Sequence, residues 1–227
     1  MTQTWSSPKY REICKSRFSN LELPVSDAGS DAGSAVKRAL LSVLLLAPLG
    51  AFAVTACRTC RLSGVVELDG SPVDPRVNAG AQASVLIFTR SDCPISNRYA
   101  PELNRLAASF APRNVAFWSI YVDKSQDPAL IRQHVADYQL PGRVAIDRKH
   151  RLVALVGAQV TPEAALFDAR GRLVYHGRID DRFVDLNIAR PEPTQRDLEQ
   201  ALHTLLSGSA PTVAHLPAVG CLIEDLR

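Results

Sequence analysis

The sequence predicts an α/β domain in which helices cover both faces of a mixed central sheet. Short apolar segments at 84–89 and 114–122 have the length and composition of buried strands, and amphipathic helical patterns begin at Pro101 and Pro128. Strands that alternate with helices pair in parallel, whereas the turn residues 168–171 between two apolar segments predict an antiparallel hairpin. These patterns together predict a three-layer α/β/α arrangement.

The elements of the first half are predicted from the residues that begin and end them. The segment 63–68 has the composition of a short strand, and Asp69-Gly70 predicts the turn after it. Proline is favoured in the first turn of a helix, so Pro101 and Pro128 mark two helix starts. The inward residues expected in the second helix are Leu130, Ile131, Val135 and Tyr138. Trp118 and Tyr121 lie in the strand 114–122, and we expect both in the core.

The second half contains shorter elements. Apolar pieces at 144–147 and 152–156 flank a basic turn, and the hairpin strands are expected at 164–167 and 173–176. We expect Thr194 to cap a final helix with Asp197 as its third residue, and Gly208 to end that helix. The acidic residues of the loop before it could bind a cation, but a solvated, salt-bridged loop is favoured; they are Asp180, Asp181 and Asp185.

Composition excludes several classes of function. The chain has 227 residues and a formal net charge of +3, without a basic run of the kind that nucleic-acid binding requires. It has no phosphate-binding loop, dinucleotide fingerprint, Ser–His–Asp motif or zinc-helix motif. The five histidines are dispersed. We therefore expect no nucleic-acid partner, no metal and no cofactor.

The N-terminal region predicts export. Residues 39–56 carry no charge and follow Lys37 and Arg38, which is typical of a secretory signal, and the segment ends in a lipobox-like sequence before Cys57. We interpret Cys57 as the lipidation site of a periplasmic or outer-surface lipoprotein. A cleaved soluble form and a single membrane anchor are the alternatives. Residues 1–35 are expected to be a disordered leader or an extension upstream of a true start at Val36.

These signals divide the chain into four parts. The leader covers 1–35, the signal segment covers 36–57, the folded domain covers 58–208, and an extended C-terminal tail covers 209–227.

Cys93 stands where a buried strand gives way to a helix. At that position the unpaired backbone N–H groups of the first helical turn point toward the sulfur and stabilise a thiolate, the nucleophilic form of cysteine. Its neighbours Ser91, Asp92, Ser96 and Asn97 are polar, unlike those of a structural core cysteine. The pattern therefore indicates a functional thiol.

The residues around Cys93 resemble a known family. The segment 88–103 (FTRSDCPISNRYAPEL) is similar to the redoxin branch of the thioredoxin superfamily, which groups alkyl hydroperoxide reductase-like and thiol-specific antioxidant-like proteins. The similarity continues through 160–164 (VTPEA) and 177–181 (GRIDD), and covers about 62–207. It is greatest to bacterial exported redoxins.

The resemblance implies a thioredoxin-like fold and a thiol chemistry that needs no cofactor. In such proteins the first motif cysteine, here Cys93, attacks a protein disulfide or a hydroperoxide, and an external thiol reductant restores it. A cis-proline opposite the cysteine presents backbone to the substrate, which implies this role for Pro162. The implied substrate-binding residues are Thr89, Asp92, Pro94, Ser96, Thr161 and Pro162.

The sequence also departs from the family. Ser96 replaces the second cysteine of a Cys-x-x-Cys pair, and Arg90 and Leu86 replace the threonine and proline that peroxidases usually place three and seven residues before the cysteine. Cys221 is the candidate second thiol downstream, with a structural or unpaired tail cysteine as the alternative. Cys60 has no assigned role. The missing second motif cysteine keeps open a non-catalytic thioredoxin-fold module that binds a partner at the cell surface.

Overall fold

The computed structural model describes residues 62, 64–211 and 215–224. The chain divides into two units, 1–60 and 61–227, and the described residues all belong to the second. The leader 1–35, the signal segment 36–57 and the expected lipid site Cys57 lie outside the described residues, as does Cys60. Within the described ranges no helix is long and apolar enough to span a membrane.

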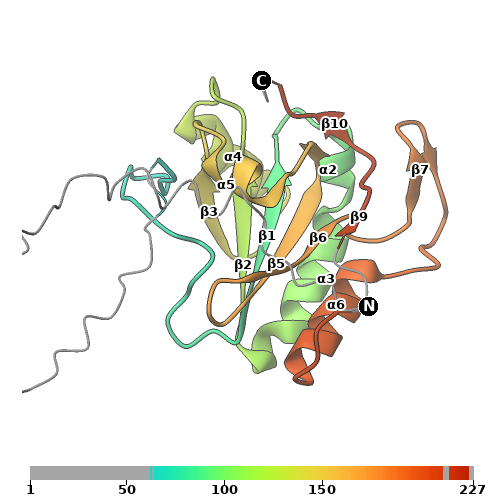
Figure 1. Cartoon of the computed structure of the whole chain (residues 1–227). Coiled ribbons are helices and arrows are strands. Elements are labelled where there is room, and N and C mark those ends of the chain that lie inside the picture. The colour runs from blue at the N-terminus through green and yellow to red at the C-terminus, as the bar shows by residue number, and fades with distance from the viewer. Residues whose placement is uncertain (1–61, 63, 212–214, 225–227) are drawn as a thin grey trace, which may run out of the picture. The chain divides into compact units, whose positions relative to one another are not determined.

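A six-stranded mixed sheet forms the centre of the domain (Figure 1). Its order is β3-β2-β1-β5-β6-β9. The parallel strands β1, β2 and β3 pair with one another, β5 runs antiparallel to both β1 and β6, and β9 lies parallel to β6. The bounds are β1 Ala83–Thr89, β2 Val115–Tyr121, β3 Arg143–Ile146, β5 Glu163–Asp168, β6 Leu173–Gly177 and β9 His215–Leu216. The predicted mixed sheet and its hairpin are confirmed.

Helices lie on both faces of the sheet, as predicted. They are α2 Pro94–Arg98, α3 Ala100–Phe110, α4 Pro128–Asp137, α5 Arg151–Val156 and α6 Asp197–Leu206, with a 3-10 turn η1 at Ala111–Arg113. Alternate residues of β1 enter opposite cores, because successive side chains of a strand point to opposite faces. Val85 and Ile87 share a cluster with residues of α3 and α6, whereas Leu86 and Phe88 share one with residues of α5. Trp118 and Tyr121 are buried in the core, as expected.

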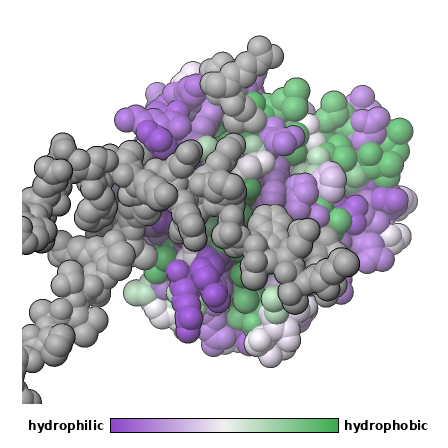
Figure 2. Space-filling view, in the orientation of Figure 1, coloured by the Kyte–Doolittle hydropathy of each residue, from purple (hydrophilic) through white to green (hydrophobic). Residues whose placement is uncertain are grey.

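Two small two-stranded sheets complete the domain. Strand β4 (Val160–Thr161) pairs with β10 (Cys221–Leu222), and β7 (Phe183–Asp185) pairs with β8 (Ile188–Ala189). The β7–β8 hairpin projects from the domain, and Figure 2 shows apolar side chains gathered on it. Its exposed apolar residues are Val184, Leu186 and Ile188.

The predicted strand at 63–68 is wrong. Among residues 64–68, which the structure describes, only Val66 is bridged, to Pro72 and to Ile146. The chain turns back at once, because the N–H of Glu67 donates to the carbonyl of Ser71. Because the chain turns so soon after Val66, the two segments on either side of the turn are too short to pair as strands.

Two expectations about the helices also fail. In α4, Leu130 is 58% exposed and Tyr138 is 40% exposed, whereas His134 is buried. The final helix is preceded by Arg196 as its N-cap, because Thr194 donates its N–H and hydroxyl groups to Asp181 instead. The acidic loop is solvated only in part: Asp180 and Asp181 are buried, whereas Asp185 is exposed. The expected salt bridge is present, since Asp181 lies 3.4 Å from Arg190. Gly208 does lie just beyond α6, with φ of +89°.

Candidate thiol site

Cys93 occupies the junction between β1 and α2. It is the N-cap residue of α2, with extended backbone angles, and Pro94 follows in the first turn. The N–H of Asn97 donates to the Cys93 carbonyl at 3.1 Å, which closes the first turn of α2. The predicted change from strand to helix at Cys93 is therefore confirmed.

Thr161 and Pro162 lie beside this sulfur. The Thr161–Pro162 peptide bond is cis. Cys93 Sγ lies 3.0 Å from the carbonyl oxygen of Thr161, to which the thiol donates. The segment that joins β4 to β5 thus supplies a backbone oxygen directly at the sulfur.

The second thiol of the site comes from the C-terminal segment. In β10, Cys221 pairs with Thr161 of β4 and Leu222 pairs with Val160, in antiparallel register. This pairing brings Cys221 Sγ to 2.6 Å from Cys93 Sγ. Both cysteines are free thiols, since a disulfide has an S–S length of about 2.05 Å. The two sulfurs lie in direct contact although 128 residues separate them in the chain.

The pKa values of the two thiols are shifted in opposite directions from that of an ordinary cysteine. Burial raises the pKa of Cys93, but hydrogen bonds to Cys221, Ser96 and Thr161 outweigh it and hold the pKa below its ordinary value. Burial and the adjacent Cys93 sulfur raise the pKa of Cys221 to about 12. The shifts have opposite directions, so Cys93 is the more acidic thiol of the pair. The hydroxyl group of Ser96 is buried and has no other hydrogen-bond partner among the described residues, so it is available to the Cys93 sulfur.

The site is closed to solvent. Cys93 is 1% exposed, whereas Cys221 is partly exposed. Polar groups surround the Cys93 sulfur although apolar side chains pack against the rest of the residue. The Cys93 sulfur is therefore buried in this structure, with Cys221 of the C-terminal segment against it.

Hydrogen bonds from His134 of α4 and from Asn97 support the loop before Cys93. His134 lies between the hydroxyl group of Tyr121, 2.6 Å from Nδ1, and Oδ1 of Asn97, 2.8 Å from Nε2. Asn97 in turn donates to the carbonyl of Ser91 at 3.0 Å. Burial lowers the pKa of His134, so the neutral ring accepts at Nδ1 and donates from Nε2.

The structure brings together some of the predicted substrate-binding residues and separates others. Ser96, Thr161 and Pro162 adjoin the sulfur pair and are buried. Thr89 is buried at the end of β1, and Pro94 is exposed at the start of α2. Asp92 is directed to solvent, where Arg90 donates two hydrogen bonds to its carboxylate.

Three residues that hold the C-terminal segment were missed by sequence reasoning. Gly220 approaches the Thr161 carbonyl, Ile223 is 5% exposed, and Glu224 lies 3.6 Å from Arg90. The glycine immediately before Cys221 was a signal of close backbone approach. The other two follow only from the pairing of β10 with β4.

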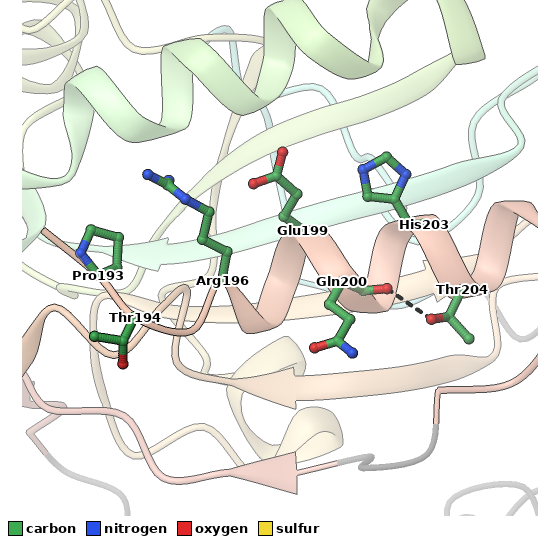
Figure 3. Close-up of a pocket in the computed structure, with 7 residues that line it drawn as sticks. All are labelled: Pro193, Thr194, Arg196, Glu199, Gln200, His203 and Thr204. Atoms are coloured by element: carbon green, nitrogen blue, oxygen red, sulfur yellow. Dashed lines mark hydrogen bonds between the residues drawn. The ribbon is translucent and has the colours of Figure 1, made fainter.

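A pocket of about 420 Å³ opens elsewhere, along α6 (Figure 3). Its lining comprises Pro193, Thr194, Arg196, Glu199, Gln200, His203 and Thr204. No cysteine borders it, so it is separate from the sulfur pair. Among the described residues, no group of three or more His, Cys, Asp or Glu side chains is arranged to hold a metal ion.

Comparison with known proteins is consistent with this geometry. The AhpC/TSA family matches residues 63–176, which is just over half of the chain. An uncharacterized conserved protein from Geobacillus kaustophilus is 25% identical, with a TM-score of 0.60, and the alignment covers 70% of this chain and 86% of that one. A hypothetical protein from Sinorhizobium meliloti is 23% identical, with a TM-score of 0.58 and coverage of 70% and 88%. No curated protein sequence matches.

Proposed function

Because the chain belongs to the AhpC/TSA family, the redoxin branch of the thioredoxin superfamily, we propose that Cys93 and Cys221 form one redox couple. Thiol oxidoreductase chemistry is the type of function that this family carries. The observation that carries the specific proposal is the 2.6 Å separation of the two sulfurs. The couple cycles between the dithiol and an intramolecular disulfide.

Cys93 is the attacking thiol of the proposed cycle. With a hydroperoxide, its thiolate attacks the terminal oxygen, the O–O bond breaks and the sulfur becomes a sulfenic acid. The alkoxide that leaves takes a proton from water and becomes an alcohol. With a disulfide substrate, the thiolate attacks one sulfur and releases the other as a thiol. The lowered pKa of Cys93 supports this role because the thiolate is the reactive form.

Cys221 is the resolving thiol. It condenses with the sulfenic acid and releases water, or attacks the mixed disulfide and releases the second substrate thiol. Either route oxidises Cys93 and Cys221 to one disulfide, and an external dithiol returns two electrons to regenerate both thiols. The antiparallel pairing of β10 with β4 supports this role because it places Cys221 at the Cys93 sulfur without a large movement.

The test uses the full chain and two matched variants. Hydrogen peroxide and an oxidised small-molecule disulfide are each added to the reduced protein, and non-reducing peptide mass spectrometry identifies the products. We expect a Cys93–Cys221 cross-linked peptide in the wild type. Cys221→Ser should instead accumulate a sulfenic acid that reacts with dimedone, or a mixed disulfide, on Cys93. Equal oxidation of Cys93→Ser would overturn the assignment, and an inert wild type would favour the non-catalytic binding module.

Export to an oxidising compartment is part of the proposal. The uncharged segment 39–56 after Lys37 and Arg38 supports it, as does the lipobox-like sequence before Cys57. We expect the mature N-terminus to be a diacylated Cys57. Mass spectrometry of the protein purified from bacterial membranes tests this, and an unprocessed N-terminus in the cytoplasmic fraction would contradict it.

A further inference from the structure

Residues 219–224 occupy the edge of β4 beside Cys93, and several contacts hold them there. Cys221 and Leu222 pair with Thr161 and Val160. Beyond the strand, the N–H of Ile223 donates to the carbonyl of Gln159 at 2.9 Å. The chain therefore fills, with its own segment, the backbone edge along which an extended polypeptide would reach the sulfur.

The position before the cysteine admits only glycine. A Cβ at Gly220 would stand 2.2 Å from the carbonyl oxygen of Thr161 and 2.7 Å from its carbonyl carbon. Both are backbone atoms, so no side-chain rotation relieves the clash. A residue larger than glycine would push the segment away from β4 and the cysteine away from Cys93.

The contacts of this segment also favour particular residue types at two positions that follow Cys221, namely those of Ile223 and Glu224. The side chains alternate, as in a strand: Leu222 is 74% exposed, whereas Ile223 is 5% exposed. Ile223 belongs to the apolar cluster that includes Leu152, Val156 and Ala158. At the next position, Glu224 Oε1 lies 3.6 Å from Nη1 of Arg90. The burial of Ile223 thus selects an apolar residue two positions after the cysteine. The ion pair with Arg90 adds a weaker preference for an acidic residue three positions after it, because the Glu224 side chain is 81% exposed.

We propose, building on the proposed function, that residues 219–224 are a tethered occupant of a strand-binding site for polypeptide partners. The partner presents a cysteine in an extended segment, with glycine before it, an apolar residue two positions after it and an acidic residue three positions after it. Its segment displaces β10 and pairs with β4 in the same register. While the chain's own segment is docked, Cys93 is shielded from any polypeptide thiol or disulfide.

The shielding is tested with two variants of neighbouring residues. Ile223→Asp removes the buried anchor and should release the segment, whereas Leu222→Asp places the same charge on a side chain that is already exposed. Alkylation of Cys93 by a polyethylene-glycol maleimide is followed by peptide mass spectrometry. We expect Ile223→Asp to react about tenfold faster than wild type or more, because burial of one isoleucine governs the open fraction. Leu222→Asp should react at the wild-type rate, and equal rates in all three proteins would overturn the shielding.

The recognition is tested with peptides added to the full-length Ile223→Asp chain. The probe is a fluorescent copy of the segment with serine in place of cysteine (PAVGSLIED), and binding is measured by anisotropy. We expect it to bind Ile223→Asp and not the wild type, whose site is filled. The same peptide with valine in place of its glycine should not bind, and one with lysine in place of its first acidic residue should bind more weakly. Equal binding of the glycine and valine peptides, or no binding to the released chain, would overturn the proposal.

These measurements separate this inference from the proposed function. Neither readout requires oxidation, since alkylation traps the reduced thiol and the probe peptide has no sulfur. Binding and shielding without a Cys93–Cys221 disulfide would retain the strand site and remove the redox couple. The disulfide without differential binding would retain the couple and remove the strand site.

Discussion

Nε2 of His134 lies 2.8 Å from Oδ1 of Asn97, so a ring on α4 supports α2, the helix whose N-cap is Cys93. The same ring accepts a hydrogen bond from Tyr121. The chain of contacts continues from Asn97 to the carbonyl of Ser91. The loop that carries the thiol is thereby tied to the C-terminal end of β2, beside the end of β1, by buried and half-buried polar groups.

Replacing His134 should weaken both the fold and the placement of the thiol. His134→Leu leaves the Tyr121 hydroxyl and Asn97 Oδ1 without this partner, and we expect the free energy of unfolding to fall by about 2 kcal/mol. Urea denaturation measures this. Gln133→Leu, at an exposed position of the same helix, is the control and should leave the stability within experimental error. A His134→Leu protein as stable as that control would show that the network contributes nothing.

The ionisation of Cys93 should depend on Cys221. A lowered pKa keeps the Cys93 thiolate populated at lower pH, so the midpoint of its iodoacetamide reaction should lie below the value of an unperturbed cysteine, about 8.5. Cys221→Ala removes one donor to the thiolate, and the midpoint should rise. The rate is followed against pH at the Cys93 peptide by mass spectrometry. An unchanged midpoint in Cys221→Ala would contradict the coupling of the two thiols.

Asp147 should be a major stabilising residue away from the thiols. Its carboxylate accepts from the N–H groups of Arg151, Leu152 and Val153 at 2.7, 2.7 and 3.0 Å, at the start of α5. Asp147→Ala leaves these donors unpaired, and we expect a loss of about 2 kcal/mol in the free energy of unfolding. The exposed Asp137→Ala is the comparison, measured in the same urea titration. Similar stabilities of the two variants would disprove the capping role.

Asp180 should make the stability depend on pH. Burial raises its pKa even though Tyr99 donates to Oδ1 at 2.6 Å. A carboxyl group whose pKa is higher in the folded state binds its proton there first, so its effect on stability becomes less favourable as pH rises above about 3.9, its unfolded value. Asp180→Asn removes this titration.

We therefore expect the advantage of Asp180→Asn over the wild type to be greatest at neutral pH and to shrink as pH falls toward 4. Urea titrations at several pH values test this, with the exposed Asp185→Asn as the control. A difference between Asp180→Asn and the wild type that stays constant with pH would contradict the raised pKa.

Local sequence patterns were sufficient for the strands of the central sheet other than β9, and for the first thiol. The apolar segment of β1, the Asp168-to-Gly171 turn and Cys93 before Pro94 are each determined by neighbouring residues. The hydrogen-bond partners of His134 could not be predicted in the same way, because Tyr121 and Asn97 come from other elements. Likewise, the carboxylate of Asp181 accepts hydrogen bonds from Thr194, 13 residues further along the chain. No capping pattern in the sequence indicates this contact.

The contact of the two thiols is a non-local result. Cys221 was identified as a candidate because it is a cysteine downstream of the motif, but its register depends on Gly220 at the Thr161 carbonyl. That approach involves backbone atoms of segments far apart in the chain. Periodicity within either segment carries no information about it.

The C-terminal segment also completes the central sheet. Before it reaches the thiols it forms β9, which pairs with β6 at His176 and Gly177, and the carbonyl of Leu216 accepts from the N–H of Arg178. Cleavage before His215 would therefore strip one margin of the sheet and leave unpaired N–H and C=O groups there, a surface prone to join another chain. Proteolytic loss of this segment would thus make the protein prone to aggregate while it uncovers the reactive sulfur.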